Sequence, residues 1–360
     1  MELTSFSFKE PSWSILAFKP LHQTNLLVGR NASGKSKTLK AMFYAASYIL
    51  QNDILFRPDT VEVNLSFNLD VDNDGRISTL SYSFSYANKR VVNESMIYNG
   101  EEVIIRNNSV ASILEESVTP PEDKLIIHVR RDVNFYPLTE RLVRWAENVR
   151  FVPFGDIGDT IVDHRLVSRI SNSQRLFDLY EKLSDDQRKN IIVECQQLGF
   201  NIQDIVPFSA EQLRVMTFRE EGIIAPIPEF FLSDGMIRTI YLLFYIKYVE
   251  SSKVNSMLLI DDLGEGLDYR RSVDLGKKIF DICKNHNVQL FVTSNDSFLM
   301  DAVDLEHWNI LHRNGNVVNV INQANKPELF RRFKMTGLSN FDLFSSDFIE
   351  SFNMQSEKDA

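Results

Sequence analysis

Cysteine and long apolar runs are scarce in this chain. Only two of its 360 residues are cysteine, Cys195 and Cys283, and their spacing matches neither a metal-ligand motif nor a disulfide framework. The sequence contains no run of about 18 apolar residues, the length needed to span a membrane. Its first residues lack the basic and apolar segments of an export signal. We therefore expect a cytoplasmic protein in a reducing compartment, with no membrane span.

Basic residues are also in deficit. The chain has 39 Lys and Arg against 49 Asp and Glu, a formal net charge of −10, which disfavours general affinity for a nucleic acid backbone. A local basic patch stays open as an alternative, and one arginine-rich segment is a candidate for it. Its members are Arg130, Arg131, Arg141, Arg144 and Arg150. Internal salt bridges and solvated helix faces are the favoured interpretation of this segment.

A phosphate-binding loop is the most specific motif present. Residues 29–36 match the pattern G-x-x-x-x-G-K-[ST], in which backbone N–H groups surround phosphate, Lys35 reaches the β/γ oxygens and Ser36 can bind Mg²⁺. A short apolar strand at 25–28 precedes the loop, and an amphipathic helix follows it, so a helix N-terminus faces the phosphates. The predicted nucleotide-binding residues are Gly29, Arg30, Asn31, Ala32, Ser33, Gly34, Lys35, Ser36 and Lys37.

An apolar strand ending in two carboxylates is expected to complete this site. Residues 256–260 are mostly apolar and are followed by Asp261 and Asp262. We predict that Asp261 holds Mg²⁺ beside Ser36. Asp262 stands where a general base or water-positioning carboxylate is needed for hydrolysis of the γ-phosphate, with Lys35 and Asn295 as the other catalytic candidates.

Three later segments resemble motifs of the ABC-type ATPases. Leu232-Ser233-Asp234-Gly235-Met236 resembles the L-S-G-G-Q signature, and 263–268 resembles the D-loop, ending on Asp268. Asn295 follows another apolar strand, where that family has its switch histidine. The order and spacing of these segments agree with the family. The alternative for Ser233, Asp234 and Gly235 is a purely structural role as a helix cap.

Within that superfamily the chain resembles the OLD/RecF/SMC-like branch, and in particular small bacterial AAA family ATP-binding proteins. The phosphate loop and the early hairpins carry this resemblance. No coiled-coil arm, Cys-x-x-Cys hook or acidic pattern of a TOPRIM nuclease occurs in the sequence. The resemblance implies a homodimer in which two ATP molecules lie between phosphate loop and partner signature, so that Ser233 and Gly235 act in trans.

Three departures from the family pattern predict slow hydrolysis. Asp262 replaces the usual Glu and is one methylene shorter. Asn295 replaces the His and cannot titrate. Asp234 places a carboxylate beside a phosphate-facing helix end. We expect a slow ATPase or an ATP-timed switch.

The expected fold class is α/β, a P-loop NTPase of ABC-ATPase type with a mixed sheet, an antiparallel β subdomain and a helical insertion. Short strands are expected at 61–69, 80–86 and 125–129, and mostly helix from 138 to 215. The predicted divisions are an N-terminal ATPase lobe at 1–128, a mainly helical insertion at 129–228, a C-terminal ATPase lobe at 229–325 and a Phe-rich tail at 326–360.

Three further patterns have competing interpretations. Asp70, Asp72, Asp74, Gly75 and Ile77 match the start of a calcium-binding EF-hand loop, but Ser81 replaces its last Glu and strands flank it, so a solvated turn is favoured. Trp13 is more compatible with a core position than with stacking on adenine. In the tail, a helical stripe of Phe341, Phe344, Phe348 and Phe352 is expected to pack on its own domain, with partner docking as the alternative.

The resemblance implies that the protein regulates a separately encoded effector and that its setting is anti-phage defence. The alternatives left open are a RecF-like DNA-binding clamp in recombination or repair and a catalytically silent ATP-sensing scaffold. A transporter subunit fits least, because 198 residues separate Lys35 from Ser233.

Overall fold

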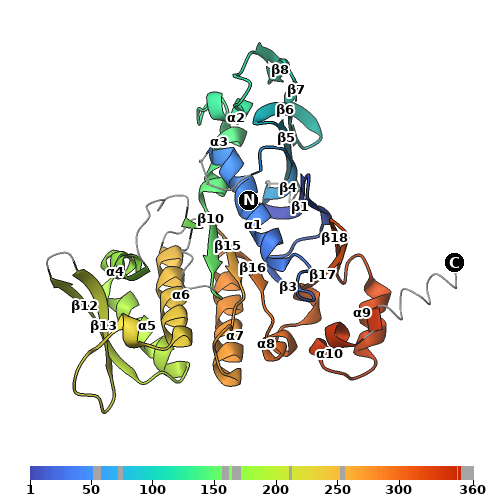
Figure 1. Ribbon diagram of the computed structural model, residues 1–360. Coiled ribbons are helices and arrows are strands. Elements are labelled where there is room, and N and C mark those ends of the chain that lie inside the picture. The colour runs from blue at the N-terminus through green and yellow to red at the C-terminus, as the bar shows by residue number, and fades with distance from the viewer. Residues whose placement is uncertain are drawn as a thin grey trace.

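The computed structural model describes residues 1–51, 58–71, 76–155, 162–163, 172–210, 213–251, 256–346 and 348–349. One large sheet runs through the molecule, with helices against it and a small second sheet at one end (Figure 1). Among the described residues, no helix combines the length and the apolar character needed to cross a membrane.

The parallel part of the large sheet contains the strands that precede the predicted motifs. In spatial order these are β10 (Val149–Pro153), β15 (Ser256–Asp261), β16 (Val288–Thr293), β3 (Thr24–Val28) and β17 (Trp308–Asn314). The short β11 (Val162–Asp163) pairs antiparallel with β10. Because β16 lies between β15 and β3, the carboxyl ends of three motif strands meet at one edge, where open sheets bind ligands.

The antiparallel part extends the same sheet beyond β17. It contains β18 (Val317–Ile321), β2 (Trp13–Phe18), β1 (Glu2–Glu10), β4 (Val61–Val71), β5 (Ile77–Ala87), β6 (Arg90–Tyr98), β7 (Glu101–Asn107), β8 (Val110–Ile113) and β9 (Glu116–Val118). The predicted hairpin is confirmed, because β4 and β5 pair with Leu65 opposite Tyr82. Residues 72–75, on which the calcium interpretation depends, lie outside the described residues.

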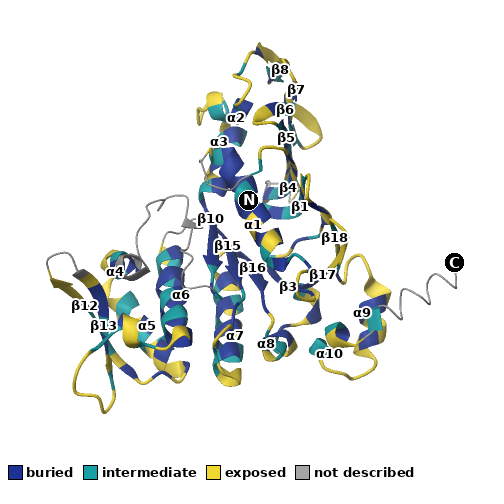
Figure 2. Cartoon of the chain, viewed as in Figure 1, coloured by how far each residue is buried: buried dark blue, intermediate teal, exposed yellow. Residues whose placement is uncertain are grey.

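Each face of the parallel sheet carries its own core. Strand residues alternate between the faces: Met257 and Leu259 of β15 pack in a cluster with α1 (Lys35–Leu50) and α3 (Pro137–Glu147). Leu258 and Ile260 pack with α6 (Asp234–Ser251) and α7 (Tyr269–Asn285). Figure 2 shows these strands as almost wholly buried. The phosphate-loop helix and the signature helix therefore lie on opposite faces of one sheet.

The region 129–228 differs from the predicted mainly helical insertion. It contains α4 (Asn172–Lys182) and α5 (Asp185–Gln197), but β10 belongs to the large sheet, and β12 (Ile202–Ala210), β13 (Leu213–Glu220) and β14 (Ile227–Pro228) form a second, antiparallel sheet. In β12 the buried positions Ile202 and Ile205 are three residues apart, a spacing that also fits a helix. The expectation of mostly helix from 138 to 215 is wrong for 202–210, because these residues form β12.

The predicted strand at 125–129 is also wrong. Residues Ile126–Val129 form the short helix α2, since an apolar run of this length does not distinguish a strand from a buried helical turn. Glu94 stabilises the start of this helix, because its carboxylate accepts hydrogen bonds from the N–H groups of Ile126 (2.6 Å) and Ile127 (3.4 Å). The domain boundaries remain predictions.

The C-terminal part returns to short elements around the parallel strands. These are η1 (Glu229–Phe231), α8 (Ser297–Ala302), η2 (Leu305–His307), α9 (Pro327–Lys334) and α10 (Asn340–Ser345). Phe341, Phe344 and Phe348 pack against the same core as α6 and α7, and Phe348 makes an edge contact with Phe333. The favoured packing of the Phe stripe on its own domain is thus confirmed for these three residues, while Phe352 lies outside the described residues.

Candidate nucleotide site

The phosphate loop has the backbone shape that its glycines predict. Strand β3 is buried along its whole length, and a Cβ on Gly29 would meet the Ser33 Oγ at 2.3 Å and the Leu311 carbonyl oxygen at 2.9 Å. Gly34 has φ +101°, a conformation that glycine adopts without strain. The loop therefore closes tightly before α1 begins at Lys35.

Trp13 lies beneath this loop and is only 1% exposed. Its Nε1 is 3.2 Å from where a Gly34 Cβ would stand, and the Lys37 Nζ lies 5.1 Å from its ring centroid. The Lys37 Nζ also pairs with Glu10 at 2.5 Å. The core interpretation of Trp13 is confirmed, because a ring this buried has no face free to stack on a nucleotide base.

Lys35 is held inside the loop and near the acidic strand end. Its side chain is 6% exposed, and its Nζ donates a hydrogen bond of 2.7 Å to the Gly29 carbonyl. Burial lowers the pKa of Lys35, and the negative charges of Asp262 and Asp261 act in the opposite direction. Because Coulomb interactions fall with distance, the structure brings the lysine and the two carboxylates into one site.

Thr293 connects the Asp261 carboxylate with the backbone of Asp262. It ends β16, and its Oγ1 donates to the Asp261 Oδ1 at 2.6 Å while accepting from the Asp262 N–H at 2.8 Å. Asp261 is 8% exposed, so this bond fixes a buried carboxylate at the end of β15. The sequence analysis assigned no role to Thr293, because its contacts depend on the pairing of β16 with β15.

Asp262 and Asn295 lie in direct contact. The Asn295 Nδ2 donates to the Asp262 Oδ1 at 3.0 Å, which brings together two residues that the sequence assigned to catalysis. Burial raises the pKa of Asp262, the neighbouring Asp261 raises it further, and Lys35 opposes this. The backbone of Asp262 has φ +55°, and a Cβ on Gly155 would come within 2.8 Å of the Asp262 Cβ. Gly155 is a second residue that the sequence analysis missed.

The predicted magnesium ligands have suitable chemistry. Asp261 and Ser36 offer a carboxylate and a hydroxyl, and Mg²⁺ in nucleotide sites takes one or two protein oxygens together with phosphate and water oxygens. Within the described ranges, no group of three or more His, Cys, Asp or Glu side chains could hold a metal by itself. When bound, Mg²⁺ would neutralise charge on the phosphates. A shared site with a substrate triphosphate fits these residues, whereas an all-protein cage does not.

The signature residues lie against the D-loop of the same chain. Helix α6 begins at Asp234, and a Cβ on Gly235 would stand 2.4 Å from the Gly266 carbonyl oxygen. One turn further on, Arg238 Nη1 donates to the Glu265 carbonyl at 3.2 Å. Ser233 and Asp234 are exposed, so the start of α6 presents these two side chains to solvent.

The D-loop residue Asp268 has a structural role in this chain. Its carboxylate caps α7 by accepting from the Arg271 N–H at 3.1 Å and pairs with Arg271 Nη1 at 3.0 Å. The cap satisfies one of the free N–H groups at the helix start. Asp268 therefore fixes where α7 begins relative to the loop on which Gly235 rests.

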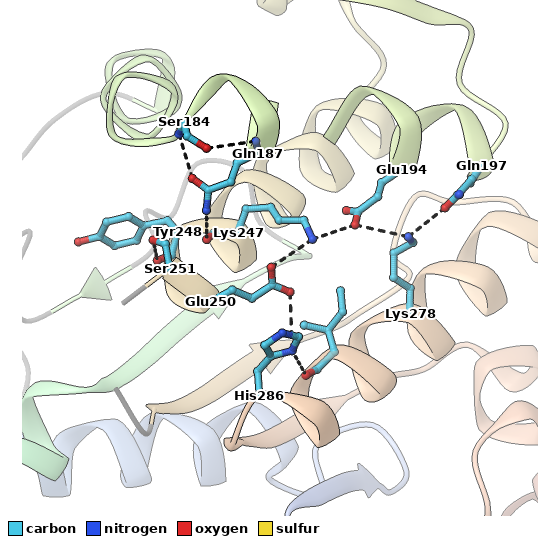
Figure 3. A network of polar contacts seen from close by, with 11 residues as sticks. Ser184, Gln187, Glu194, Gln197, Lys247, Tyr248, Glu250, Ser251, Lys278 and His286 are labelled. Atoms are coloured by element: carbon cyan, nitrogen blue, oxygen red, sulfur yellow. Dashed lines mark hydrogen bonds and ion pairs between the residues drawn. The ribbon is translucent and has the colours of Figure 1, made fainter. Parts of the chain in front are cut away.

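An ion-pair network connects α6 with its neighbours on this face (Figure 3). The Lys247 Nζ of α6 pairs with Glu194 of α5 at 3.0 Å and with Glu250 at 3.1 Å, and Lys278 of α7 lies 3.7 Å from Glu194. Burial lowers the pKa of Lys247, but the two carboxylates outweigh it and raise the pKa overall. The network holds α6 at a fixed position between α5 and α7.

The arginine-rich segment is partly used within the chain. Arg150 is fully buried and donates to the Ser256 Oγ at 2.6 Å. Arg131 forms a two-point pair with Glu140, with Nη2 to Oε2 at 2.9 Å. These two arginines therefore fit the favoured interpretation of internal pairing.

Comparison with known proteins identifies the family. Residues 24–301 match the family model described as AAA domain, putative AbiEii toxin, Type IV TA system. No curated protein matches the sequence.

Solved structures give the fold. A crystal structure of the SmcHead bound to the C-winged helix domain of ScpA is 13% identical, with a TM-score of 0.56, and the match covers 91% of this chain and all of that one. The Smc head domain with an extended coiled coil, bound to the C-terminal domain of ScpA derived from Pyrococcus furiosus, is 11% identical, with a TM-score of 0.50, and covers 92% and 99%. The chain thus has the fold of ABC-type ATPases of the SMC/RecF-like branch, and it belongs to the family described as AAA domain, putative AbiEii toxin, Type IV TA system.

Proposed function

We propose that this protein binds ATP with Mg²⁺, forms a homodimer around two ATP molecules and hydrolyses them slowly. The observation that carries the proposal is the convergence of Lys35, Asp261, Asp262 and Asn295 at one edge of the sheet. A P-loop lysine, a metal carboxylate and a base candidate are the groups that phosphoryl transfer to water requires.

The chain's own residues have separable tasks in this proposal. Backbone N–H groups of the loop and the Lys35 ammonium would hold the β- and γ-phosphates. Asp262 would accept a proton from the attacking water, and the Asn295 amide would keep the carboxylate oriented through the 3.0 Å hydrogen bond. The backbone of Asp262 has φ +55°, and its side chain is shorter than the glutamate of the family pattern. The shorter side chain supports slow turnover, below roughly 10 per second.

Support for the dimer comes from where the signature lies. Ser233 and Asp234 are exposed, while Gly235 packs against the D-loop of its own chain. The start of α6 is held against the chain's own D-loop by the packing of Gly235 on Gly266 and by the hydrogen bond from Arg238 to the Glu265 carbonyl. Such a helix end offers N–H donors to an anion brought by a second copy.

ATP-dependent dimerisation is the test of the proposal. The Asp262→Asn variant, which should bind but not hydrolyse, is followed by light scattering after size exclusion with ATP, with ADP and without nucleotide. We expect a dimer with ATP alone. A monomer under all three conditions, with ATP binding established by calorimetry, would overturn the dimer while leaving nucleotide binding intact.

We further propose that the protein works in the cytoplasm by regulating a separately encoded effector protein, with anti-phage defence as its setting. The two cysteines are buried and unpaired, which suits a reducing compartment. The two Smc head structures are complexes with another protein, ScpA, which supports a protein partner. Purification with the product of a neighbouring gene, with and without ATP, tests this. DNA stimulation of turnover would favour the RecF-like alternative instead.

A further inference from the structure

A cavity lies directly beside the phosphate loop, on the side of the C-terminal tail. Its volume is about 370 Å³, and loop residues Arg30–Ser33 form one wall. The end of β17 and the following turn form a second wall, with His312 and Arg313, and the tail closes it with Phe344, Ser346 and Ile349. Figure 1 shows α9 and α10 beside β17. The cavity is therefore lined by three separate parts of the chain, at 30–33, 310–321 and 344–349.

The walls of the cavity combine apolar and basic groups. Ile310, Leu311, Ile321, Phe344 and Ile349 supply apolar surface. The charged or titratable side chains that line it, Arg30, His312 and Arg313, are all basic. Arg313 is positioned by hydrogen bonds from Nε to the Gly315 carbonyl at 2.7 Å and from Nη1 to the Ala32 carbonyl at 3.4 Å. The surface therefore suits a flat, partly apolar group attached to an anion.

We propose that this cavity takes the nucleoside end of the bound nucleotide, the ribose and the base, with the C-terminal tail as one of its walls. The inference rests on the proposed nucleotide binding. Trp13 is not available for base stacking because it is buried beneath Gly34. The cavity adjoins the loop that would hold the phosphates, its volume lies within the range of ligand sites, and arginine, histidine and phenylalanine side chains pack well against the flat face of a base.

This assignment gives the tail a task in the ATPase. Phe344 packs against the core of the parallel sheet, and α10 is tied to the main domain through Asp301, which accepts from the Phe341 N–H at 2.6 Å. Binding of a nucleoside against Phe344 and Ile349 would hold the tail in place, whereas inorganic triphosphate would not.

Calorimetry with two ligands, ATP and inorganic tripolyphosphate, tests the inference. Phe344→Ala and the exposed His312→Ala should each weaken ATP binding about tenfold through lost contact with the base, with tripolyphosphate binding unchanged. The matched controls are Ser345→Ala on the same helix, which is exposed, and Asn314→Ala on the same strand, neither of which lines the cavity; both should bind ATP as the wild type does.

The outcomes separate this inference from the function on which it rests. If the wild type binds neither ligand, the proposed nucleotide binding fails. If the wild type binds both and the two cavity variants keep full ATP affinity, or lose tripolyphosphate equally, the nucleoside assignment alone is wrong. Should Phe344→Ala not fold, the exposed His312→Ala decides the question.

Discussion

The phosphate-loop half of the site and its signature half are built in different ways. In the first, Lys35, Asp261, Asp262 and Thr293 are buried or half-buried; Thr293 is hydrogen-bonded to both aspartates, and Lys35 to the Gly29 carbonyl of its own loop. In the second, Ser233 and Asp234 are exposed, and only the backbone at Gly235 is packed, against the chain's own D-loop. In the proposed function, the first half supplies its groups from within one chain. The second presents exposed side chains at the start of a helix, as its proposed action on a neighbouring copy requires.

The largest effect should come from removing Lys35. In Lys35→Ala the loop loses its buried cation, and with it charge-assisted bonds to two phosphates, so ATP affinity should fall at least about 100-fold. ATP-induced dimerisation and turnover should be lost together. Lys40→Ala, an exposed lysine of the same helix, is the matched control. Calorimetry and light scattering measure both consequences, and ATP-dependent dimers of Lys35→Ala would contradict the sandwich arrangement.

Asp262→Asn should separate binding from chemistry. The amide keeps the size of the side chain but cannot accept the proton, so single-turnover hydrolysis should fall about 10²- to 10⁴-fold with ATP affinity kept. Asp262→Glu restores a carboxylate and should retain turnover. A rate unchanged in Asp262→Asn, measured by quenched-flow release of phosphate, would show that Asp262 is not the base.

A buried carboxylate outside both halves provides a contrast. Burial raises the pKa of Glu94 to about 7, partly offset by hydrogen bonds from Ile126, Tyr82 and Ile127. The pKa of Glu94 is higher in the folded state than in the unfolded chain, so its protonated form stabilises the fold. This contribution to the free energy of unfolding is complete below about pH 4.5 and is lost as pH rises through about 7. Glu94→Gln should remove up to about 3 kcal/mol of that pH dependence.

Urea unfolding at several pH values measures the effect of Glu94. The variant should keep the ATP affinity of the wild type, because Glu94 lies in the antiparallel part of the sheet. A pH dependence of unfolding identical in wild type and Glu94→Gln would show that another group is responsible. Loss of ATP binding at neutral pH would connect this region to the site.

The smallest predicted effect concerns the acid limb of the pH–rate profile, that is, the fall of the hydrolysis rate at low pH. The pKa of Asp262 is raised, so hydrolysis should increase as pH rises through that pKa and the base loses its proton. Asn295 donates to the carboxylate and favours its charged form, so Asn295→Ala should move the limb to higher pH. Single-turnover rates across pH measure this shift. A limb that stays in place, or moves to lower pH, would mean that Asn295 does not act through Asp262.

Short, local patterns were enough to locate the residues that meet at the edge of the sheet. The loop at 29–36, the strand ending in Asp261 and Asp262, and Asn295 were all identifiable because each follows an apolar strand of the parallel sheet. Thr293 was missed because its role is visible only when β16 lies beside β15. The packing of Gly235 against Gly266 joins residues 31 positions apart in the sequence, which no local pattern encodes. Likewise, the burial spacing of Ile202 and Ile205 fits either a helix or a strand.

Mixing two inactive variants tests the central claim most directly. Lys35→Ala removes the phosphate-loop half, and Ser233→Arg blocks the exposed signature half without touching the buried carboxylates. If each site joins the loop of one chain to the signature of another, a mixed dimer contains one intact site, and the mixture should regain ATP hydrolysis that neither variant shows alone. Full activity of Ser233→Arg by itself, or no recovery in a mixture of folded variants, would contradict the composite site.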